Sequence, residues 1–140
     1  MKNKIASISL VLLALFAFEI GTAQELTLDK EVHDYGTMKQ GANGECVFIV
    51  TNTGTAPLII SNCKGSCGCT VPQCDKAPIP PGATQEIKVK YDTKRVGPIN
   101  KSVTITSNAT NTPTKMIRIK GNILAKPATP GTSTTPGTAK

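Results

Sequence analysis

Four of the five cysteines lie within a short stretch of sequence, where their side chains could bind a metal ion. They are Cys63, Cys67, Cys69 and Cys74, in the pattern C-x3-C-x-C-x4-C. Thiolates are soft ligands that suit Cu(I) and Zn(II), and four of them can surround a metal ion tetrahedrally. One hypothesis is therefore a thiolate site for Cu(I) or Zn, although the spacing differs from the paired C-x2-C of common zinc sites.

The same cluster also contains a candidate for thiol–disulfide exchange. Cys67 and Cys69 form a C-x-C pair, and the ammonium group of Lys64 could lower the pKa of a thiol nearby. The sequence has no C-x-x-C motif to strengthen this interpretation. A redox couple is therefore a third hypothesis for the cluster, beside the metal site and the disulfides that are considered below.

The N-terminus shows the three parts of a secretory signal. Lys2 and Lys4 precede an apolar run over residues 5–18, and the small residues 21–23 fit a signal peptidase site. The run is shorter than the roughly 20 residues that a membrane-spanning helix needs, and the alternative is an uncleaved membrane anchor. We predict a signal peptide over residues 1–23, a periplasmic or secreted protein, and no transmembrane helix after cleavage.

Export makes disulfides the expected state of the cysteine cluster, because they form and persist in oxidising compartments. A bond between Cys67 and Cys69 would close a very tight ring, which the geometry of disulfides disfavours. Two pairings then remain open. They are Cys63–Cys67 with Cys69–Cys74, and Cys63–Cys69 with Cys67–Cys74.

Length and charge limit the class of protein. The chain has 140 residues and a formal net charge of +7, a size that excludes a large multidomain enzyme, a solenoid and a polytopic membrane protein. Residues 93–140 carry eight basic and no acidic side chains, and such a field can attract an anionic surface. Export argues against nucleic acid as a partner. Basic and apolar residues alternate along the chain, which favours a simpler interpretation than a binding surface. The basic side chains then lie on the solvent faces of strands, namely Lys88, Lys90, Arg118 and Lys120.

The sequence contains few residues that could form a catalytic site. His33 is the only histidine, and nothing around it supplies the nucleophile and orienting acid of a hydrolase. Phosphate-binding loops and H-E-x-x-H motifs are absent from the sequence. We predict a protein that is not an enzyme, has no catalytic residues, and binds no cofactor apart from the metal hypothesis above.

Short runs of alternating apolar and polar residues predict an all-β fold. The clearest are residues 45–51, 85–91, 101–107 and 116–120, with a more buried run at 57–60 and weaker ones at 26–28 and 69–72. Turn residues separate them, among them Asn52-Thr53-Gly54, Pro80-Pro81-Gly82 and Gly97-Pro98. About seven short strands in about 100 residues are typical of an antiparallel β-sandwich.

This pattern sets the domain bounds and the place of the fifth cysteine. The sandwich should cover residues 24–124, because residues 125–140 contain Thr, Pro, Gly, Ala, Ser and Lys only and cannot bury enough apolar surface to fold. We predict that they form a disordered tail.

Cys46 alternates with Phe48 and Val50 and should face the core, where free cysteine packs as a small hydrophobe. We therefore assign Cys46 a structural role.

Several motifs together resemble one family, the bacterial exported domain of unknown function 1573. The resemblance covers about residues 30–124. It rests on His33-Asp34-Tyr35-Gly36, Gly41, F-I-V-T-N-T-G over 48–54, Pro57-Leu58, Ser66-Cys67-Gly68-Cys69-Thr70, I-P-P-G over 79–82, Val89-Lys90-Tyr91-Asp92, Gly97 and Ile119-Lys120-Gly121.

The resemblance implies an Ig-like sandwich similar to major-sperm-protein and cilia-associated domains, and no established activity. By analogy with those scaffolding and interaction modules, we expect a non-enzymatic module that binds an envelope or extracellular protein. The family's shared cysteines correspond to Cys67 and Cys69. The resemblance thus implies that the additional pair, Cys63 and Cys74, either bridge one another or extend the C-x-C into a four-ligand site.

Overall fold

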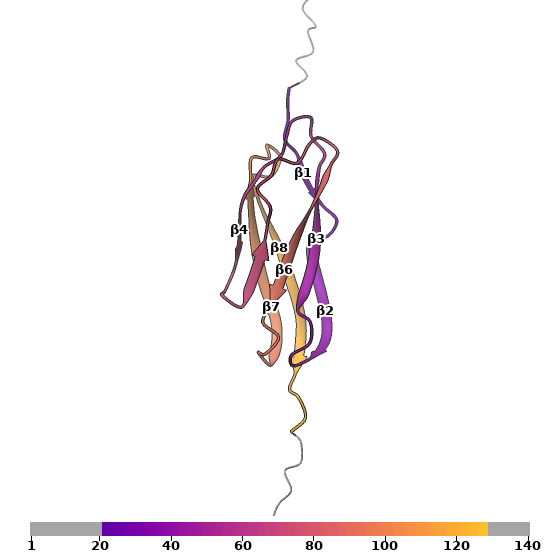
Figure 1. Cartoon of the computed structure of the whole chain (residues 1–140), viewed down its shortest axis with the longest axis vertical. Helices are drawn as coiled ribbons and strands as arrows, with labels where there is room; N and C mark the ends of the chain where they lie inside the picture. Colours follow the sequence, from indigo (N-terminus) through magenta and orange to yellow (C-terminus); the bar gives the residue numbers. More distant parts are fainter. Residues whose placement is uncertain (1–20, 129–140) are drawn as a thin grey trace, which may run out of the picture.

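The structure is a computed structural model that describes residues 21–128. This part of the chain folds into eight strands and no helix, arranged as two four-stranded sheets packed face to face (Figure 1). The first sheet has the order β1 (Leu26–Leu28), β3 (Glu45–Asn52), β6 (Thr84–Tyr91), β5 (Thr70–Gln73). The second has the order β2 (Val32–Lys39), β8 (Thr114–Leu124), β7 (Gly97–Ser107), β4 (Ile60–Gly65).

Two predictions concern residues that the structure leaves out in large part. The predicted signal peptide, 1–23, falls almost wholly outside the described residues, and so does most of the predicted tail, 125–140. Both stay predictions. Within residues 21–128, the chain contains no helix long and apolar enough to cross a membrane.

The alternation in the sequence places the core where it was predicted. In β3, the side chains of Cys46, Phe48, Val50 and Asn52 are buried while their neighbours are not. The same period recurs in the strands β6, β7 and β8, whose inward residues meet those of β3 between the sheets. Burial of these side chains is the main favourable term in folding. The largest fully buried apolar residues are Phe48, Leu58, Ile60, Ile87, Ile105, Ile117, Ile119 and Ile123.

The sandwich is not wholly antiparallel, which corrects the sequence prediction. β2 runs parallel to β8, with Val32 paired to Arg118 and Lys39 paired to Leu124. After β1, the chain crosses from the first sheet to the second and lies beside the last strand of the domain. Alternation shows which side chains face inward, but it carries no information about the direction of a neighbouring strand.

The strand bounds also differ from the prediction in three places. β2 was not among the predicted strands, because its side chains are all exposed or half-buried and show no clear apolar alternation. The predicted buried strand at 57–60 is mostly replaced by a single bridge between Leu58 and Ile79, and β4 begins only at Ile60. Gly97-Pro98, predicted as a turn, opens β7. Proline is tolerated at the start of a strand.

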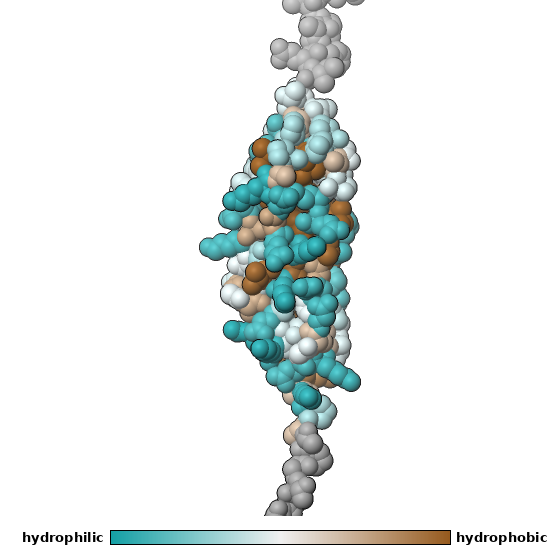
Figure 2. Space-filling model, in the orientation of Figure 1, coloured by the Kyte–Doolittle hydropathy of each residue, from teal (hydrophilic) through white to brown (hydrophobic). Residues whose placement is uncertain are grey.

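The four edge strands lie in pairs on two sides of the molecule. β4 and β5 share one side, while β1 and β2 end the sheets on the opposite side (Figure 1). The two ends of the described chain lie at opposite ends of the elongated sandwich (Figure 1). On the face drawn in Figure 2, hydrophilic residues predominate, and hydrophobic ones form small patches between them.

One buried side chain ties two turns to the core. Asn52 is fully buried, and its amide nitrogen donates to the carbonyl oxygens of Ala56 and Ile79, each at 2.8 Å. Its amide oxygen accepts from the backbone N–H of Gly54 at 3.0 Å. The side chain therefore bonds to three backbone groups, of which the carbonyl oxygen of Ile79 also accepts from the N–H of Leu58 at 3.0 Å.

We expect Asn52→Ala to lower the free energy of unfolding by about 3 kcal/mol, because buried backbone groups would lose their hydrogen bonds. Urea unfolding followed by circular dichroism measures the change. Asn122→Ala is the matched control, since Asn122 is exposed on β8. An equal effect of the two substitutions would contradict the role assigned to Asn52.

Candidate functional site

The cysteine cluster lies where the chain passes from one sheet to the other. β4 is an edge strand of the second sheet, β5 is an edge strand of the first, and residues 66–69 connect them. Ser66 stays attached to the second sheet through its N–H, which donates to the carbonyl oxygen of Ser102 at 2.8 Å. The carbonyl oxygen of Cys69 already accepts from the N–H of Asp92 in the first sheet, at 2.9 Å. The crossing is thus complete within four residues.

A disulfide joins the two edge strands. Cys63 lies in β4, and Cys74 directly follows β5. Their Cα atoms are 6.2 Å apart, and the sulfurs are bonded. This is the first of the two alternatives that the family resemblance implied for the additional cysteines, the other being a four-ligand site. The bond links the sheets covalently along the side that β4 and β5 share.

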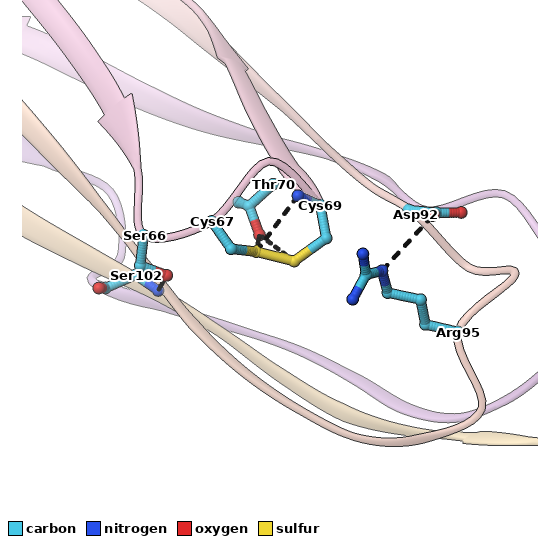
Figure 3. Close-up of a disulfide and its surroundings, with 7 residues drawn as sticks. All are labelled: Ser66, Cys67, Cys69, Thr70, Asp92, Arg95 and Ser102. Atoms are coloured by element: carbon cyan, nitrogen blue, oxygen red, sulfur yellow. Dashed lines mark hydrogen bonds and ion pairs between the residues drawn. A yellow bond between two sulfur atoms is a disulfide. The ribbon is translucent and has the colours of Figure 1, made fainter.

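The second disulfide contradicts the pairing expected from ring size. Cys67 is bonded to Cys69, and their Cα atoms are 5.2 Å apart (Figure 3). A tight turn closes the ring, because the N–H of Thr70 donates to the carbonyl oxygen of Cys67 at 3.2 Å. This Cα separation lies within the usual range for disulfides. Both pairings derived from the sequence are therefore wrong, and the reason is that a turn with Gly68 at its centre brings the two cysteines together.

The two strands approach each other so closely that one position requires glycine. A Cβ atom at Gly65 would collide with the carbonyl oxygen of Thr70. Thr70 is itself buried, and its hydroxyl oxygen lies 3.6 Å from the sulfur of Cys67 and 3.8 Å from that of Cys69 (Figure 3). The N–H of Cys69 donates to the sulfur of Cys67 at 3.3 Å. The turn therefore surrounds this disulfide with hydrogen-bond donors.

The disulfides weigh against a thiolate metal site. A sulfur in a disulfide is not a thiolate, and all four sulfurs of the predicted ligand set are bonded in pairs. Among residues 21–128, no group of three or more His, Cys, Asp and Glu side chains is arranged to hold a metal ion. A Cu(I) or Zn site formed by Cys63, Cys67, Cys69 and Cys74 stays a prediction for a reduced form of the protein.

Cys46 is the free cysteine of the described chain, and it is only 5% exposed within the core. Burial raises the pKa of its thiol, so the side chain stays neutral. Burial also raises the pKa of Tyr35, whose hydroxyl donates to the carbonyl oxygen of Gly44 at 2.7 Å. These two groups pack between β2 and β3 and are not poised to react.

His33 packs against aromatic rings at the rim of the core. Its ring lies edge-on to that of Tyr35, with centroids 4.6 Å apart, and 6.4 Å from that of Phe48. Burial and the charge of Lys30 lower the pKa of His33, while the charge of Asp34 partly opposes them. The neutral imidazole of His33 packs between the sheets and has a structural role.

The basic side chains occupy the solvent faces of strands, as their alternation predicted. Lys88 and Lys90 are exposed on β6, and Arg118 and Lys120 are exposed on β8, on the other sheet. Surface ion pairs join Lys90 to Glu45 at 3.8 Å and Lys120 to Asp34 at 3.3 Å. These positive charges are thus spread over two faces.

Comparison with known proteins establishes the family. The profile of the family described as "Protein of unknown function (DUF1573)" matches residues 26–123. The chain belongs to this family. Among curated proteins, none matches the sequence.

Solved structures share the fold at low sequence identity. A protein of unknown function from Porphyromonas gingivalis W83 is 18% identical, with a TM-score of 0.65 over 78% of this chain and 51% of that one, so this chain spans about half of its length. The seventh PapD-like domain of human CEP192 is 9% identical, with a TM-score of 0.62, over 75% of this chain and 89% of that one. A Caenorhabditis elegans MSP family member, WR4, is 10% identical, with a TM-score of 0.52, over 72% of this chain and 99% of that one. This DUF1573 chain therefore has the Ig-like fold of MSP and PapD-like domains.

Removing the two disulfides separately should affect stability differently. The bond between Cys63 and Cys74 spans a sequence separation of 11, against 2 for Cys67 and Cys69. Loop-closure entropy then predicts a loss of about 3 kcal/mol for Cys63→Ser with Cys74→Ser, and about half of that for Cys67→Ser with Cys69→Ser. Urea unfolding of the two double variants measures both values. Equal losses would show that the longer bond is not the main staple.

The lowered pKa of His33 predicts a pH dependence of folding. The folded protein binds this proton less tightly than the unfolded chain, so the contribution of His33 is complete above its ordinary pKa of 6.5 and is lost as the pH falls below it. The lowered pKa values of Asp29 and Asp34 act only near and below their ordinary value of 3.8. Unfolding free energies measured from about pH 7.5 to about pH 5 should therefore fall for the parent and change less for His33→Gln. The idea fails if both proteins show the same slope.

Proposed function

We propose that this DUF1573 protein is an exported, non-enzymatic module that binds an extended segment of another envelope or extracellular protein along the outer edge of β2. Two disulfides in the folded domain support export, since such bonds are typical of extracytoplasmic proteins. The observation that carries the binding proposal is the unpaired backbone of β2. An edge strand can accept a further strand through main-chain hydrogen bonds.

The direction of the β2 backbone follows from its pairing. Arg118 donates its N–H to the carbonyl oxygen of Glu31 at 2.8 Å, and Val32 is the register partner of Arg118. In a parallel pair, the residues flanking Val32 then bond to β8, while the N–H and C=O groups of Val32 point away from the sheet. The same holds for Asp34. The outer edge of β2 thus presents backbone donors and acceptors to solvent.

The other three edge strands carry features that oppose such pairing. On β1, the N–H and C=O of Leu26 are taken by the side-chain amide of Asn111, at 3.0 and 3.2 Å. On β5, Pro72 has no N–H to offer. The outer edge of β4 faces β5 across the Cys63–Cys74 bond. Among the four edge strands of the described domain, β2 is the one without such a block.

The side chains of β2 also suit a protein partner. Val32 is 45% exposed, and Leu124, on the neighbouring strand β8 at the far end of β2, is 50% exposed. Charged residues separate them, among them Asp34 and Lys39. Alternate side chains of an added strand could contact these positions while its backbone bonds to β2.

Photo-crosslinking in the native envelope tests the location of the binding edge. Benzoylphenylalanine at Val32 should form an adduct of discrete mass, whereas the same probe at Ile59 or Met116 should not. The exposed fractions of these two controls, 38% and 52%, lie on either side of the 45% of Val32. Adducts at all three positions, or none at Val32, would overturn the proposal.

A proline substitution tests whether the backbone carries the binding. Val32→Pro removes an N–H that points away from β8, so the sheet keeps its own hydrogen bonds. With the crosslinking probe at Lys39, Val32→Pro should lower the adduct yield about tenfold, as expected for loss of about 1.4 kcal/mol of binding energy. Val32→Thr keeps the N–H and is the control. Equal yields from the two variants would exclude β-strand addition at this edge.

A further inference from the structure

We propose that the Cys67–Cys69 disulfide is a thiol–disulfide exchange site that accepts two electrons from dithiols of other extracytoplasmic proteins. This activity would exist beside the binding function and does not depend on it. The proposal rests on the different surroundings of the two disulfides, on the donors around Cys67, and on a groove that reaches the turn.

The first point is that the fold does not need this bond to hold its sheets together. Cys63–Cys74 already joins β4 to the end of β5. The shorter bond spans only two residues, and a ring that small restricts the unfolded chain least. In addition, the Thr70 N–H to Cys67 carbonyl hydrogen bond holds the same turn without it. The presence of the Cys67–Cys69 bond is better explained by its reactivity than by a contribution to stability.

The second point is the asymmetry of the pair. Cys69 is only 5% exposed, whereas Cys67 is half-buried and thus the more accessible sulfur. The sulfur of Cys67 accepts the N–H of Cys69 at 3.3 Å and lies 3.6 Å from the hydroxyl oxygen of Thr70. Hydrogen-bond donors favour the charged form of the group that they contact. The turn is therefore arranged to stabilise a thiolate on Cys67.

Thr70 strengthens this interpretation because its hydroxyl has no other role in the described structure. The side chain is 2% exposed, and within residues 21–128 its oxygen has hydrogen-bond contacts only with the two sulfurs, at 3.6 and 3.8 Å (Figure 3). A buried hydroxyl is costly to leave unpaired. Its position allows it to donate to either sulfur when the bond between them opens.

The third point is access. A surface groove of about 430 Å³ lies between the 41–44 turn and residues 90–94 and is lined by Gly68 and Cys69. The groove therefore reaches the turn on its Cys69 side, and the half-buried Cys67 lies beside its lining rather than in it. The charged lining of the groove consists of Lys90, Lys94 and Asp92, so it is net positive. Such a field favours the approach of a substrate thiolate. The exposed side chain of Val71, at the same groove, offers an apolar contact for a peptide segment.

The exchange proceeds in two steps. A thiolate of the substrate dithiol attacks the sulfur of Cys67, the bond to Cys69 breaks, and the electron pair and then a proton go to the sulfur of Cys69. The second substrate thiol loses its proton and attacks the substrate sulfur of the mixed disulfide, which releases Cys67 as a thiolate. The substrate leaves as a disulfide. Two electrons and one proton have passed to the cysteine pair, which now holds a Cys67 thiolate and a Cys69 thiol.

Limited reduction of the oxidised mature protein tests the proposal without any substitution. The protein is treated with dithiothreitol under native conditions, quenched with acid, alkylated, and mapped by mass spectrometry of its peptides. We expect Cys67 and Cys69 to be alkylated together, about tenfold faster than Cys63 and Cys74. Equal rates, earlier opening of Cys63–Cys74, or no opening before unfolding would each overturn the proposal.

Variants test the assigned roles of the two sulfurs and of Thr70. With glutathione disulfide, Cys69→Ser should trap a mixed disulfide on Cys67, whereas Cys67→Ser should trap far less on Cys69. Thr70→Val should shift the pH midpoint for alkylation of reduced Cys67 upward, and Thr70→Ser should restore it, a change that a purely structural role would not cause. Cys63→Ser with Cys74→Ser should keep the exchange rate at Cys67–Cys69. Equal trapping at both sulfurs, or an unchanged pH midpoint, would contradict the mechanism.

Discussion

The crossing between sheets at residues 66–69 is the constraint on which much of this structure depends. Ser66 is bonded to Ser102 of one sheet, and Cys69 is already bonded to Asp92 of the other. So short a crossing forces β4 and β5 together. The need for glycine at position 65, the Cys63–Cys74 bond between the strands and the closed edge on this side all follow from it. On the opposite side, residues 29–31 carry the chain from β1 to β2, and no disulfide joins those two strands. The outer backbone of β2 stays open there.

The motifs that carry the family resemblance meet in space, in pairs. Asn52 of the N-T-G motif donates to Ile79 of the P-P-G segment, whose Gly82 donates its N–H back to the carbonyl oxygen of Asn52 at 2.8 Å. A Cβ atom at Gly121 would lie 3.0 Å from the carbonyl oxygen of Gly36, so the C-terminal I-K-G packs on H-D-Y-G. These motifs lie far apart in the sequence and are in contact in the fold.

The two disulfides of the cysteine cluster lie in different structural settings. One joins two sheets over a longer loop, and the other closes a turn beside a buried hydroxyl and a groove. Both bonds are compatible with a binding module. The Cys63–Cys74 bond near the crossing closes one side of the sandwich, which is consistent with the proposed pairing of another chain on the other side. The redox hypothesis drawn from the C-x-C spacing acquires physical support only from the contacts of Thr70 and Cys69.

The sequence by itself determined the all-β class, the inward faces of β3, β6, β7 and β8, and the buried position of Cys46, because a period of two specifies which side chains leave water. It also pointed to the cysteine cluster, since residue type and proximity are visible along the chain. Only the tertiary structure decided the cysteine pairing, the parallel β2–β8 contact and the presence of β2 itself. The small size of the ring argued against a Cys67–Cys69 bond, but the turn around Gly68 brings the two cysteines together. β2 has no fully buried side chain, and its backbone pairs with a strand some 80 residues away in sequence, which no local pattern can encode.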